Sequence, residues 1–249
     1  MSLSFLKSPT LNVPHGFSTR VGGVSEGAYA SLNLGLTTGD APDNVQRNRR
    51  LLLDAFGVDE TQVCALQQVH GNTVVEAKPS WHTIEADAAV TNEPDLLLVI
   101  NTADCLPVLF YDPETRSIGA AHAGWRGTVQ HIAAEVIGEM RERYGSSPSN
   151  IRVALGPCIQ QAAYQVGEEV KNAFDENGFP SSVYKVDDEG RYRLDIPAAN
   201  RFSLVNTGIK ADHIHSLTDC TYSEPERFFS HRRDGLRRGS HWSVIKLPA

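Results

Sequence analysis

Three apolar segments, separated by turn residues, make up most of Leu96-Leu-Leu-Val-Ile-Asn-Thr-Ala-Asp-Cys-Leu-Pro-Val-Leu-Phe-Tyr-Asp-Pro-Glu-Thr-Arg-Ser-Ile-Gly-Ala-Ala-His-Ala-Gly-Trp-Arg-Gly127. Residues 96–101, 106–111 and 117–122 have the length and aliphatic composition of buried β-strands. The turn sequence Asp112-Pro-Glu-Thr predicts that the second and third of these strands form a hairpin. Gly124 to Gly127 then leads into a helix predicted over residues 128–144, which Gly145 ends.

On either side of this stretch, the sequence alternates strand-like and helix-like segments. Further strands are predicted over residues 63–69, 73–77, 88–91, 151–155, 214–217 and 241–247, and helices over 43–56, 168–174 and 195–207. Asp43 is the expected cap of the first helix. Strands grouped in hairpins with helices between the groups indicate an α+β fold, with a mixed sheet and helices on its faces. No repeat or linker divides the chain, so we expect a single domain over residues 1–249.

Composition excludes several classes of protein. The chain has 249 residues, 41% of them hydrophobic, and a formal net charge of −7. That apolar share can form a sizeable core, and the acidic balance argues against nucleic-acid binding. No stretch approaches the ~20 apolar residues that cross a bilayer, and no secretory signal is visible at the N-terminus. The four cysteines form no CxxC pair, which fits a reducing compartment. We expect a cytoplasmic monomer that binds neither nucleic acid nor membranes.

Three potential metal ligands lie at the ends of predicted strands. Cys105 occupies the loop between two strands, His122 ends the strand after the second of them, and His70 ends another strand. Hairpin geometry can bring the Cys105 thiol close to the His122 imidazole, and His70 can supply a third ligand. One thiolate and two imidazoles suit Zn²⁺ and leave a fourth tetrahedral position open, as a catalytic zinc requires.

The same side chains have other interpretations. A cysteine between apolar strands is often a buried packing residue, and a histidine at a strand end is often an ordinary core or surface residue. A Cys–His pair without metal can also serve as nucleophile and base. Asp104 is a candidate general base or hydrogen-bond partner of a metal ligand, although an aspartate in a loop is as often a turn residue.

Several arginines can bind an anion, because a guanidinium group donates two parallel hydrogen bonds to phosphate or carboxylate. A few arginines suffice to make a pocket positive on an acidic protein. Those of interest are Arg20 before a pair of glycines, Arg47, Arg49 and Arg50 in the first predicted helix, Arg126 in a glycine turn, and Arg232 and Arg233. The three in the helix cannot share one face, so at least one of them is an ordinary solvated charge.

Taken together, these residues resemble those of the YfiH-type proteins, a family also described as multicopper polyphenol oxidases (laccases) or peptidoglycan-editing factors. The resemblance covers nearly the whole chain, through residues 18–27, 31–35, 48–49, 68–71, 86–88, 102–107, 122–127, 156–159 and 229–235. It implies an α/β sandwich related to cysteine-hydrolase toxins, with zinc bound by His70, Cys105 and His122. These three residues and Asp104 are the predicted catalytic residues. The predicted substrate-binding residues are Arg20, Asn33, Arg49 and Arg126.

Two segments depart from the family's pattern. The chain has Tyr164-Gln165-Val-Gly where the family usually has Tyr-Glu-Val-Gly, so a role that needs a carboxylate there is in doubt. After Gly235 the chain continues Leu236-Arg-Arg-Gly-Ser240, where the family usually continues Thr-Gly-Arg. We expect a contact from that tail to be shifted or lost.

The family's descriptions disagree about its chemistry. They include purine nucleoside phosphorylases with adenosine deaminase and methylthioadenosine phosphorylase activity, laccases, and editors of cell-wall precursors. A multicopper oxidase needs roughly ten histidines, largely in His-x-His pairs, whereas this chain has 9 and one such pair, His213-Ile-His215. Copper is possible, but its ligands are in poor supply.

We therefore expect a zinc-dependent purine nucleoside enzyme that takes a nucleoside and phosphate. The main alternative is an amidase that edits nucleotide-linked muropeptides such as a UDP-muramoyl amino acid. A copper polyphenol oxidase and a non-catalytic, metal-stabilised binding protein rank below these two.

Overall fold

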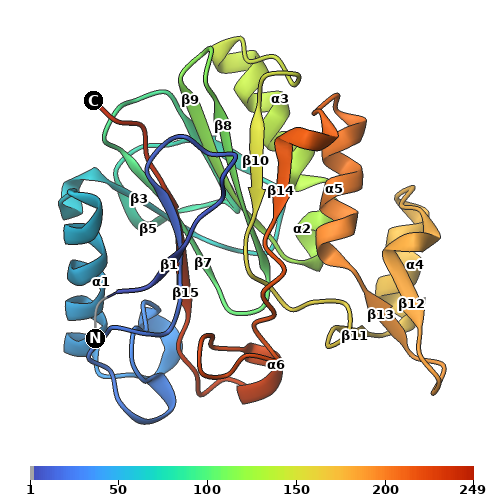
Figure 1. Cartoon of the computed structure of the whole chain (residues 1–249), viewed down its shortest axis with the longest axis horizontal. Helices are drawn as coiled ribbons and strands as arrows, with labels where there is room; N and C mark the ends of the chain where they lie inside the picture. The colour runs from blue at the N-terminus through green and yellow to red at the C-terminus, as the bar shows by residue number, and fades with distance from the viewer. Residues whose placement is uncertain (1–2) are drawn as a thin grey trace.

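Two six-stranded sheets lie face to face in the centre of the computed structural model, which describes residues 3–249 (Figure 1). In spatial order, the first sheet consists of β1 (Phe5–Leu6), β2 (His15–Ser18), β15 (His241–Ile245), β7 (Leu97–Thr102), β3 (Val63–Gln67) and β5 (Ser80–Glu85). The second consists of β14 (Ile214–Ser216), β10 (Arg152–Leu155), β8 (Leu106–Asp112), β9 (Ser117–Ala123), β6 (Ala88–Thr91) and β4 (Val74–Glu76). A small third sheet consists of β11 (Gln165–Val166), β13 (Tyr192–Leu194) and β12 (Tyr184–Val186).

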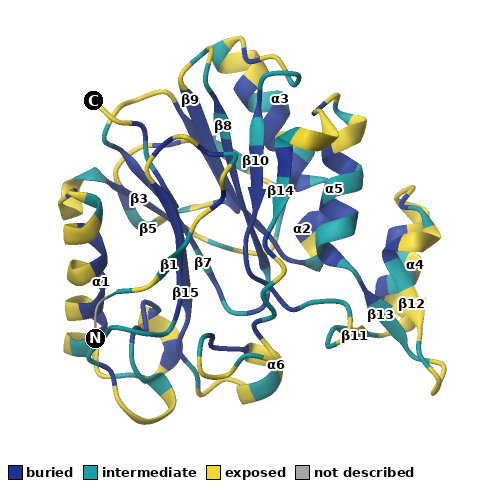
Figure 2. Cartoon of the chain, viewed as in Figure 1, coloured by how far each residue is buried: buried dark blue, intermediate teal, exposed yellow. Residues whose placement is uncertain are grey.

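Each large sheet is buried on both faces, which explains why its central strands are continuously apolar. In β7, Leu97 packs toward helix α1 (Pro42–Phe56), and Leu98 packs between the two sheets. In β8, Leu109 faces the space between the sheets, and Phe110 faces the helices on the other side. The buried colour of the central strands in Figure 2 follows from this arrangement. The layers run helix, sheet, sheet, helix.

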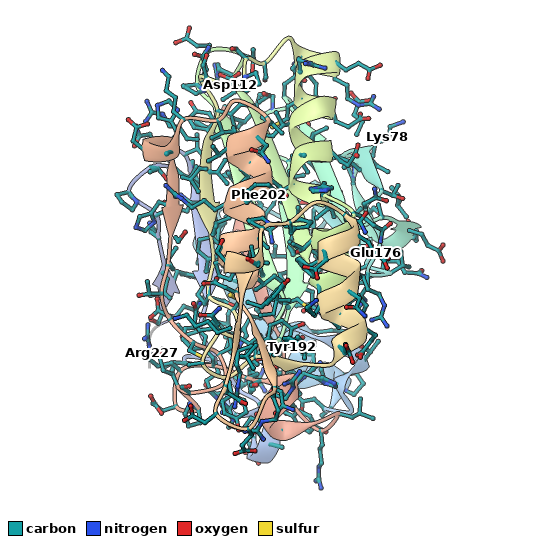
Figure 3. The ribbon with its side chains drawn as sticks, turned by 90° about the vertical axis from the view of Figure 1, so that its right-hand side faces the viewer. Lys78, Asp112, Glu176, Tyr192, Phe202 and Arg227 are labelled. Atoms are coloured by element: carbon teal, nitrogen blue, oxygen red, sulfur yellow. The ribbon has the colours of Figure 1, made fainter. Side chains whose placement is uncertain are left out.

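The helices differ in what they cover. Helices α3 (Ile132–Tyr144) and α5 (Ile196–Asn206) cover the outer face of the second sheet, and α2 (Trp125–Val129) precedes α3. Helix α4 (Glu168–Glu176) packs beside the small sheet. Figure 3 looks onto this side, with Glu176 at the end of α4, Phe202 on α5 and Tyr192 on β13. The short α6 (His231–Asp234) lies near the lower edge in Figure 1. Single 3-10 turns occupy Gly27–Tyr29, Leu36–Thr38, Glu60–Gln62, Ser181–Val183 and Ala211–His213.

The structure confirms the α+β class and the predicted hairpin. Strands β8 and β9 pair antiparallel over their whole length, and the register places Pro107 opposite His122. The sheets are mixed, because β3 pairs in parallel with β7 and β5 whereas β15 pairs antiparallel with β7 and β2. Among residues 3–249, no helix is both long enough and apolar enough to cross a membrane.

Several predicted boundaries differ from those of the structure, and the clearest differences are these. The helix predicted over 128–144 is divided into α2 and α3, because His131 adopts a left-handed conformation with φ of 58°. The His131 ring stacks on Phe179 at 4.7 Å, which fixes that break. Helix α1 begins at Pro42 after Ala41, and Asp43 provides no side-chain cap. The strand predicted over 63–69 ends at Gln67.

Candidate metal centre and its pocket

The structure brings His70, Cys105 and His122 together, although they come from three different parts of the chain. His70 follows β3, Cys105 lies between β7 and β8, and His122 lies in β9. One ligand atom from each of the three lies within 4.8 Å of the other two. The two imidazole rings are 4.7 Å apart and nearly perpendicular, with an interplanar angle of 83°. The β8–β9 register explains how Cys105 and His122 meet across 17 residues.

A buried carboxylate, Asp87, organises two of these ligands at once. Asp87 Oδ1 accepts a hydrogen bond from His122 Nδ1 at 2.7 Å. The same carboxylate accepts bonds from the backbone N–H groups of His70 at 3.0 Å and of Gly71 at 2.7 Å. A proton held on Nδ1 by a carboxylate makes Nε2 the nitrogen of His122 that would bind a metal, in place of the second ring proton. Sequence reasoning placed Asp87 in a family block but gave it no role.

The charges of the three candidate ligands are coupled. Burial opposes ionisation of the Cys105 thiol, but His122 and His70 outweigh it and lower the pKa of Cys105 to about 6. Against the effect of burial, Cys105 and Asp87 raise the pKa of His122 to about 9. Hydrogen bonds from His122 and Gly71 hold the pKa of Asp87 below its usual value despite its burial. The thiol is therefore set to ionise at neutral pH, as a metal ligand must.

The backbone leaves room for an ion beside these groups. A Cβ atom at Gly124 would lie 3.2 Å from Cys105 Sγ, 3.3 Å from His70 Cδ2 and 3.7 Å from His122 Nε2. A side chain there would fill the space between the three ligands. One thiolate and two imidazoles are donors that suit Zn²⁺, and the lack of a side chain at Gly124 leaves space for the ion. Among residues 3–249, no other group of three or more His, Cys, Asp or Glu has this geometry.

The three ligands lie in the wall of a pocket of about 1010 Å³. The pocket is large for a small-molecule site, for which about 300–1,000 Å³ is usual. Its wall also holds three large aromatic residues and four arginines, which are Trp81, Trp125, Tyr164, Arg49, Arg126, Arg232 and Arg238.

Of the predicted substrate-binding residues, Arg49 and Arg126 line this pocket. Arg49 is only 7% exposed, and its guanidinium carbon lies 4.7 Å from the centre of the Trp242 ring. Its Nε donates to Leu34 O at 2.9 Å, and burial lowers the pKa of Arg49 to about 10. Arg126 is exposed, and its guanidinium carbon lies 4.3 Å from the centre of the Trp125 ring.

Arg20 and Asn33 lie outside the pocket wall, so the structure does not bring them together with the other predicted site residues. Arg20 donates through Nε to Ala30 O and through Nη1 to Pro225 O, both at 2.6 Å. Asn33 is fully buried, and its side-chain oxygen accepts from the backbone N–H groups of Gly35 and Ser240, both at 3.0 Å. Both side chains are therefore engaged in joining segments of the protein.

Asp104 lines the pocket, but its carboxylate serves the C-terminal segment. Asp104 Oδ1 accepts from Thr221 Oγ1 at 2.6 Å, and Oδ2 accepts from Ser230 Oγ at 3.0 Å and from the backbone N–H of Arg232 at 2.6 Å. Its backbone has a φ of 90°, so the loop carrying Cys105 is tightly turned. These contacts occupy both carboxylate oxygens of Asp104 and position α6, and a catalytic role for Asp104 stays a prediction.

The two departures from the family pattern have different structural outcomes. The Gln165 side chain is exposed, and its backbone carbonyl accepts a hydrogen bond from Arg232 Nη1 at 2.8 Å. The departure at position 165 therefore leaves this backbone contact in place. In the second segment, Arg238 and Ser240 both line the pocket. Sequence reasoning marked this segment but assigned neither residue a role.

Comparison with known proteins identifies the family. Residues 14–248 match the family described as multi-copper polyphenol oxidoreductase laccase, and the chain belongs to this family. A Deinococcus radiodurans protein named purine nucleoside phosphorylase is 42% identical over 248 residues, which are 99% of this chain and 94% of that protein. The Escherichia coli K12 protein named purine nucleoside phosphorylase YfiH is 40% identical over 218 residues, 87% of each chain.

Solved structures of the same family share the fold. The crystal structure of YlmD from Geobacillus stearothermophilus has a TM-score of 0.93 and 32% identity, and the match covers 100% of this chain and 97% of that one. The Neisseria meningitidis protein NMB0706 has a TM-score of 0.90 and 35% identity, with 100% of both chains covered. These likenesses confirm the YfiH-type resemblance and the mixed-sheet α/β sandwich.

Proposed function

We propose that this chain is a zinc-dependent purine nucleoside phosphorylase that also deaminates adenosine. Its substrates would be inosine, adenosine or methylthioadenosine, together with phosphate. The observation that carries the proposal is the placement of His70, Cys105 and His122 in one pocket wall with four arginines. The names of the related proteins support purine nucleosides as the substrate class.

In this proposal, His70, Cys105 and His122 hold the metal. Zinc at this position supplies Lewis-acid catalysis. Asp87 holds the proton on Nδ1 of His122 and, through backbone bonds, orients the turn that carries His70. Cys105, whose sulfur lies within 4.8 Å of a ring nitrogen of each histidine, acts as a ligand and not as a nucleophile. A thiolate bound to a metal is less available for attack than a free one. The donor set favours zinc over copper, since one thiolate and two imidazoles without a methionine suit tetrahedral Zn²⁺.

The remaining pocket residues are assigned to substrate binding. Phosphorolysis requires phosphate to attack the ribose carbon while the purine departs, so the pocket must hold an anion and a flat ring together. Arg49 and Arg126 can bind the phosphate through charge-assisted hydrogen bonds. The aromatic faces of Trp125 and Tyr164 line the same pocket and can stack on a purine ring.

Product analysis of the purified, zinc-loaded chain tests this function. The substrates are inosine, adenosine and methylthioadenosine, each with and without phosphate, and a UDP-muramoyl-Ser precursor. We expect free purine base and a ribose 1-phosphate that form only with phosphate, and ammonia from adenosine. Release of serine from the precursor, without nucleoside turnover, would replace the proposal with the amidase. No turnover of any substrate would leave a metal-stabilised binding protein.

A further inference from the structure

Part of the pocket wall contains buried polar atoms that the protein itself does not satisfy. Arg238 Nε, Ser240 Oγ and Asn101 Oδ1 are buried and have no hydrogen-bond partner, and all three residues line the pocket. Ser240 as a whole is only 3% exposed. Native proteins pair about nine in ten buried polar groups, because an unpaired group costs ~1–3 kcal/mol. Three such residues in one wall indicate unused hydrogen-bonding capacity, which a ligand can meet when the side chains turn toward the pocket.

The charges around these atoms are also unbalanced. Within residues 3–249, no carboxylate oxygen lies within 4.0 Å of the guanidinium groups of Arg49, Arg126, Arg232 or Arg238. By contrast, Arg227, labelled in Figure 3, forms ion pairs with Asp219 at 2.6 Å and with Glu224 at 2.5 Å. The one acidic residue in the pocket wall, Asp104, is hydrogen-bonded to the C-terminal segment. Arg126 and Arg232 are exposed, but Arg49 is buried and Arg238 is half-buried. A cation that is buried without a partner is costly, so this part of the wall favours an anion.

Contacts connect Ser240 to Arg49. Leu34 donates its backbone N–H to Ser240 O at 3.1 Å, and Leu34 O accepts from Arg49 Nε at 2.9 Å. A Cβ atom at Gly35 would collide with Ser240 Oγ, so the glycine lets the hydroxyl approach the backbone. Arg238, two residues before Ser240, lies within electrostatic range of Asp104 and Cys105. Ser240 is therefore joined to Arg49 through the backbone of Leu34, and the residues with unpaired atoms line the same pocket as Arg49 and the candidate metal ligands.

We propose that Arg238 and Ser240 form, beside Arg49, a subsite for a phosphate group. Arg238 donates charge-assisted hydrogen bonds, the Ser240 hydroxyl donates one more after a rotation about its Cα–Cβ bond, and the Asn101 amide contacts a ligand hydroxyl. A tetrahedral phosphate has enough acceptor oxygens for both arginines and the serine, whereas a carboxylate has two. The identity of the anion as free phosphate rests on the proposed phosphorolysis; the subsite itself does not.

Direct phosphate binding to the metal-loaded full chain tests the subsite. Inorganic phosphate is titrated by calorimetry into wild type and into Arg238→Gln, Arg238→Lys and Ser240→Ala. We expect Kd to rise about 10- to 100-fold in Arg238→Gln, the loss expected for one charged hydrogen-bond donor. Arg238→Lys should recover only part of this loss, because an ammonium group cannot donate two parallel hydrogen bonds as a guanidinium group does. The matched control is Arg237→Gln, which removes an adjacent exposed arginine that is not part of the pocket wall.

Thermal unfolding separates a ligand-binding role from a structural one. If Ser240 Oγ serves a ligand, Ser240→Ala without phosphate should be as stable as wild type or more stable, because it removes an unsatisfied buried group. The same variant should show a smaller rise of Tm on addition of phosphate. A destabilised Ser240→Ala with unchanged phosphate affinity, or an unchanged Kd in folded Arg238→Gln, would overturn the subsite.

A competition experiment identifies the source of the phosphate group and separates this inference from the proposed function. If the subsite takes free phosphate, KM for phosphate rises in Arg238→Gln while KM for inosine stays within about twofold, since only the anion contact is lost. If it takes a phosphate ester, a nucleoside 5′-monophosphate binds in an Arg238-dependent way and inorganic phosphate competes weakly. Arg238-dependent phosphate binding without any nucleoside turnover would keep the subsite and reject the phosphorylase.

Discussion

The two ends of the pocket differ in how their polar atoms are satisfied. At the metal end, which holds the candidate ligands His70, Cys105 and His122, Asp87 accepts four hydrogen bonds, one of which fixes His122. At the arginine end, Arg238 and Ser240 carry buried atoms without partners. A site for a permanently held ion is organised in advance by the protein, because the ion stays when substrate leaves. A site for an exchanging ligand keeps open hydrogen-bonding capacity.

Removing the metal should have the largest effect. Chelation, or the Cys105→Ala, His122→Ala double variant, should lower nucleoside turnover by more than about 100-fold, since loss of a mere partner of a ligand already costs ~10–100-fold. Metal analysis should find one zinc per wild-type chain and none in the double variant. Activity that survives a chelator but is abolished by a thiol alkylator would show that Cys105 is a nucleophile instead.

Weakening the support of the metal end should have a smaller effect. Asp87→Asn removes the charge that holds His122, so we expect zinc affinity to fall about 10- to 100-fold. Competition with a chromogenic chelator measures this affinity. The matched control is Asp112→Asn, because Asp112 is equally buried but lies at the opposite end of the β8–β9 hairpin. Equal losses in the two variants would mean that Asp87 contributes only to the stability of the fold.

Substitutions at two arginines should distinguish a residue that binds the anion from one that only stabilises the fold. Arg49→Ala should raise KM for phosphate about tenfold, because a charged donor to the anion is lost. Arg20→Ala should leave this KM unchanged but lower the free energy of unfolding by about 2 kcal/mol, because two backbone carbonyls lose their partner. Steady-state kinetics measures KM for phosphate, and denaturant unfolding measures the free energy of unfolding. A KM effect in Arg20→Ala would contradict its placement outside the pocket.

Acid should destabilise the protein through the arginine end. Burial, reinforced by Arg20 and Arg238, lowers the pKa of His241 to about 3. Unfolded His241 has a pKa near 6.5, so between pH 6.5 and pH 3 the unfolded chain binds a proton that the native chain excludes. Stability is therefore lost as pH falls through this range, by up to ~1.4 kcal/mol per pH unit. Urea unfolding of wild type and His241→Gln should show a shallower dependence on pH in the variant; identical slopes would count against this cause.

Sequence patterns anticipated the parts of the site that depend on local geometry. The turn at Asp112 sets the β8–β9 register, and that register alone places Cys105 and His122 at one end of a hairpin. The apolar strands were found for the same reason, since burial on both faces produces runs that are visible in the sequence. Arg20 and Asn33 are predicted from the sequence to bind substrate, yet they line no part of the pocket. A polar turn rich in glycine has the same composition whether it binds an anion or a neighbouring backbone.

The sequence by itself determined the α+β class, the central hairpin and the residue types of the candidate metal site, since these follow from short-range periodicity and donor chemistry. Only the tertiary structure decided that Asp87 supports the ligands and that Arg238 and Ser240 reach the pocket. Strand β15 pairs with β7, placing Trp242 opposite Asn101, more than a hundred residues away in the chain. Contacts of this kind arise from the burial of whole sheets against one another. The local sequence does not predict such contacts, because a buried strand is apolar whichever strand it pairs with.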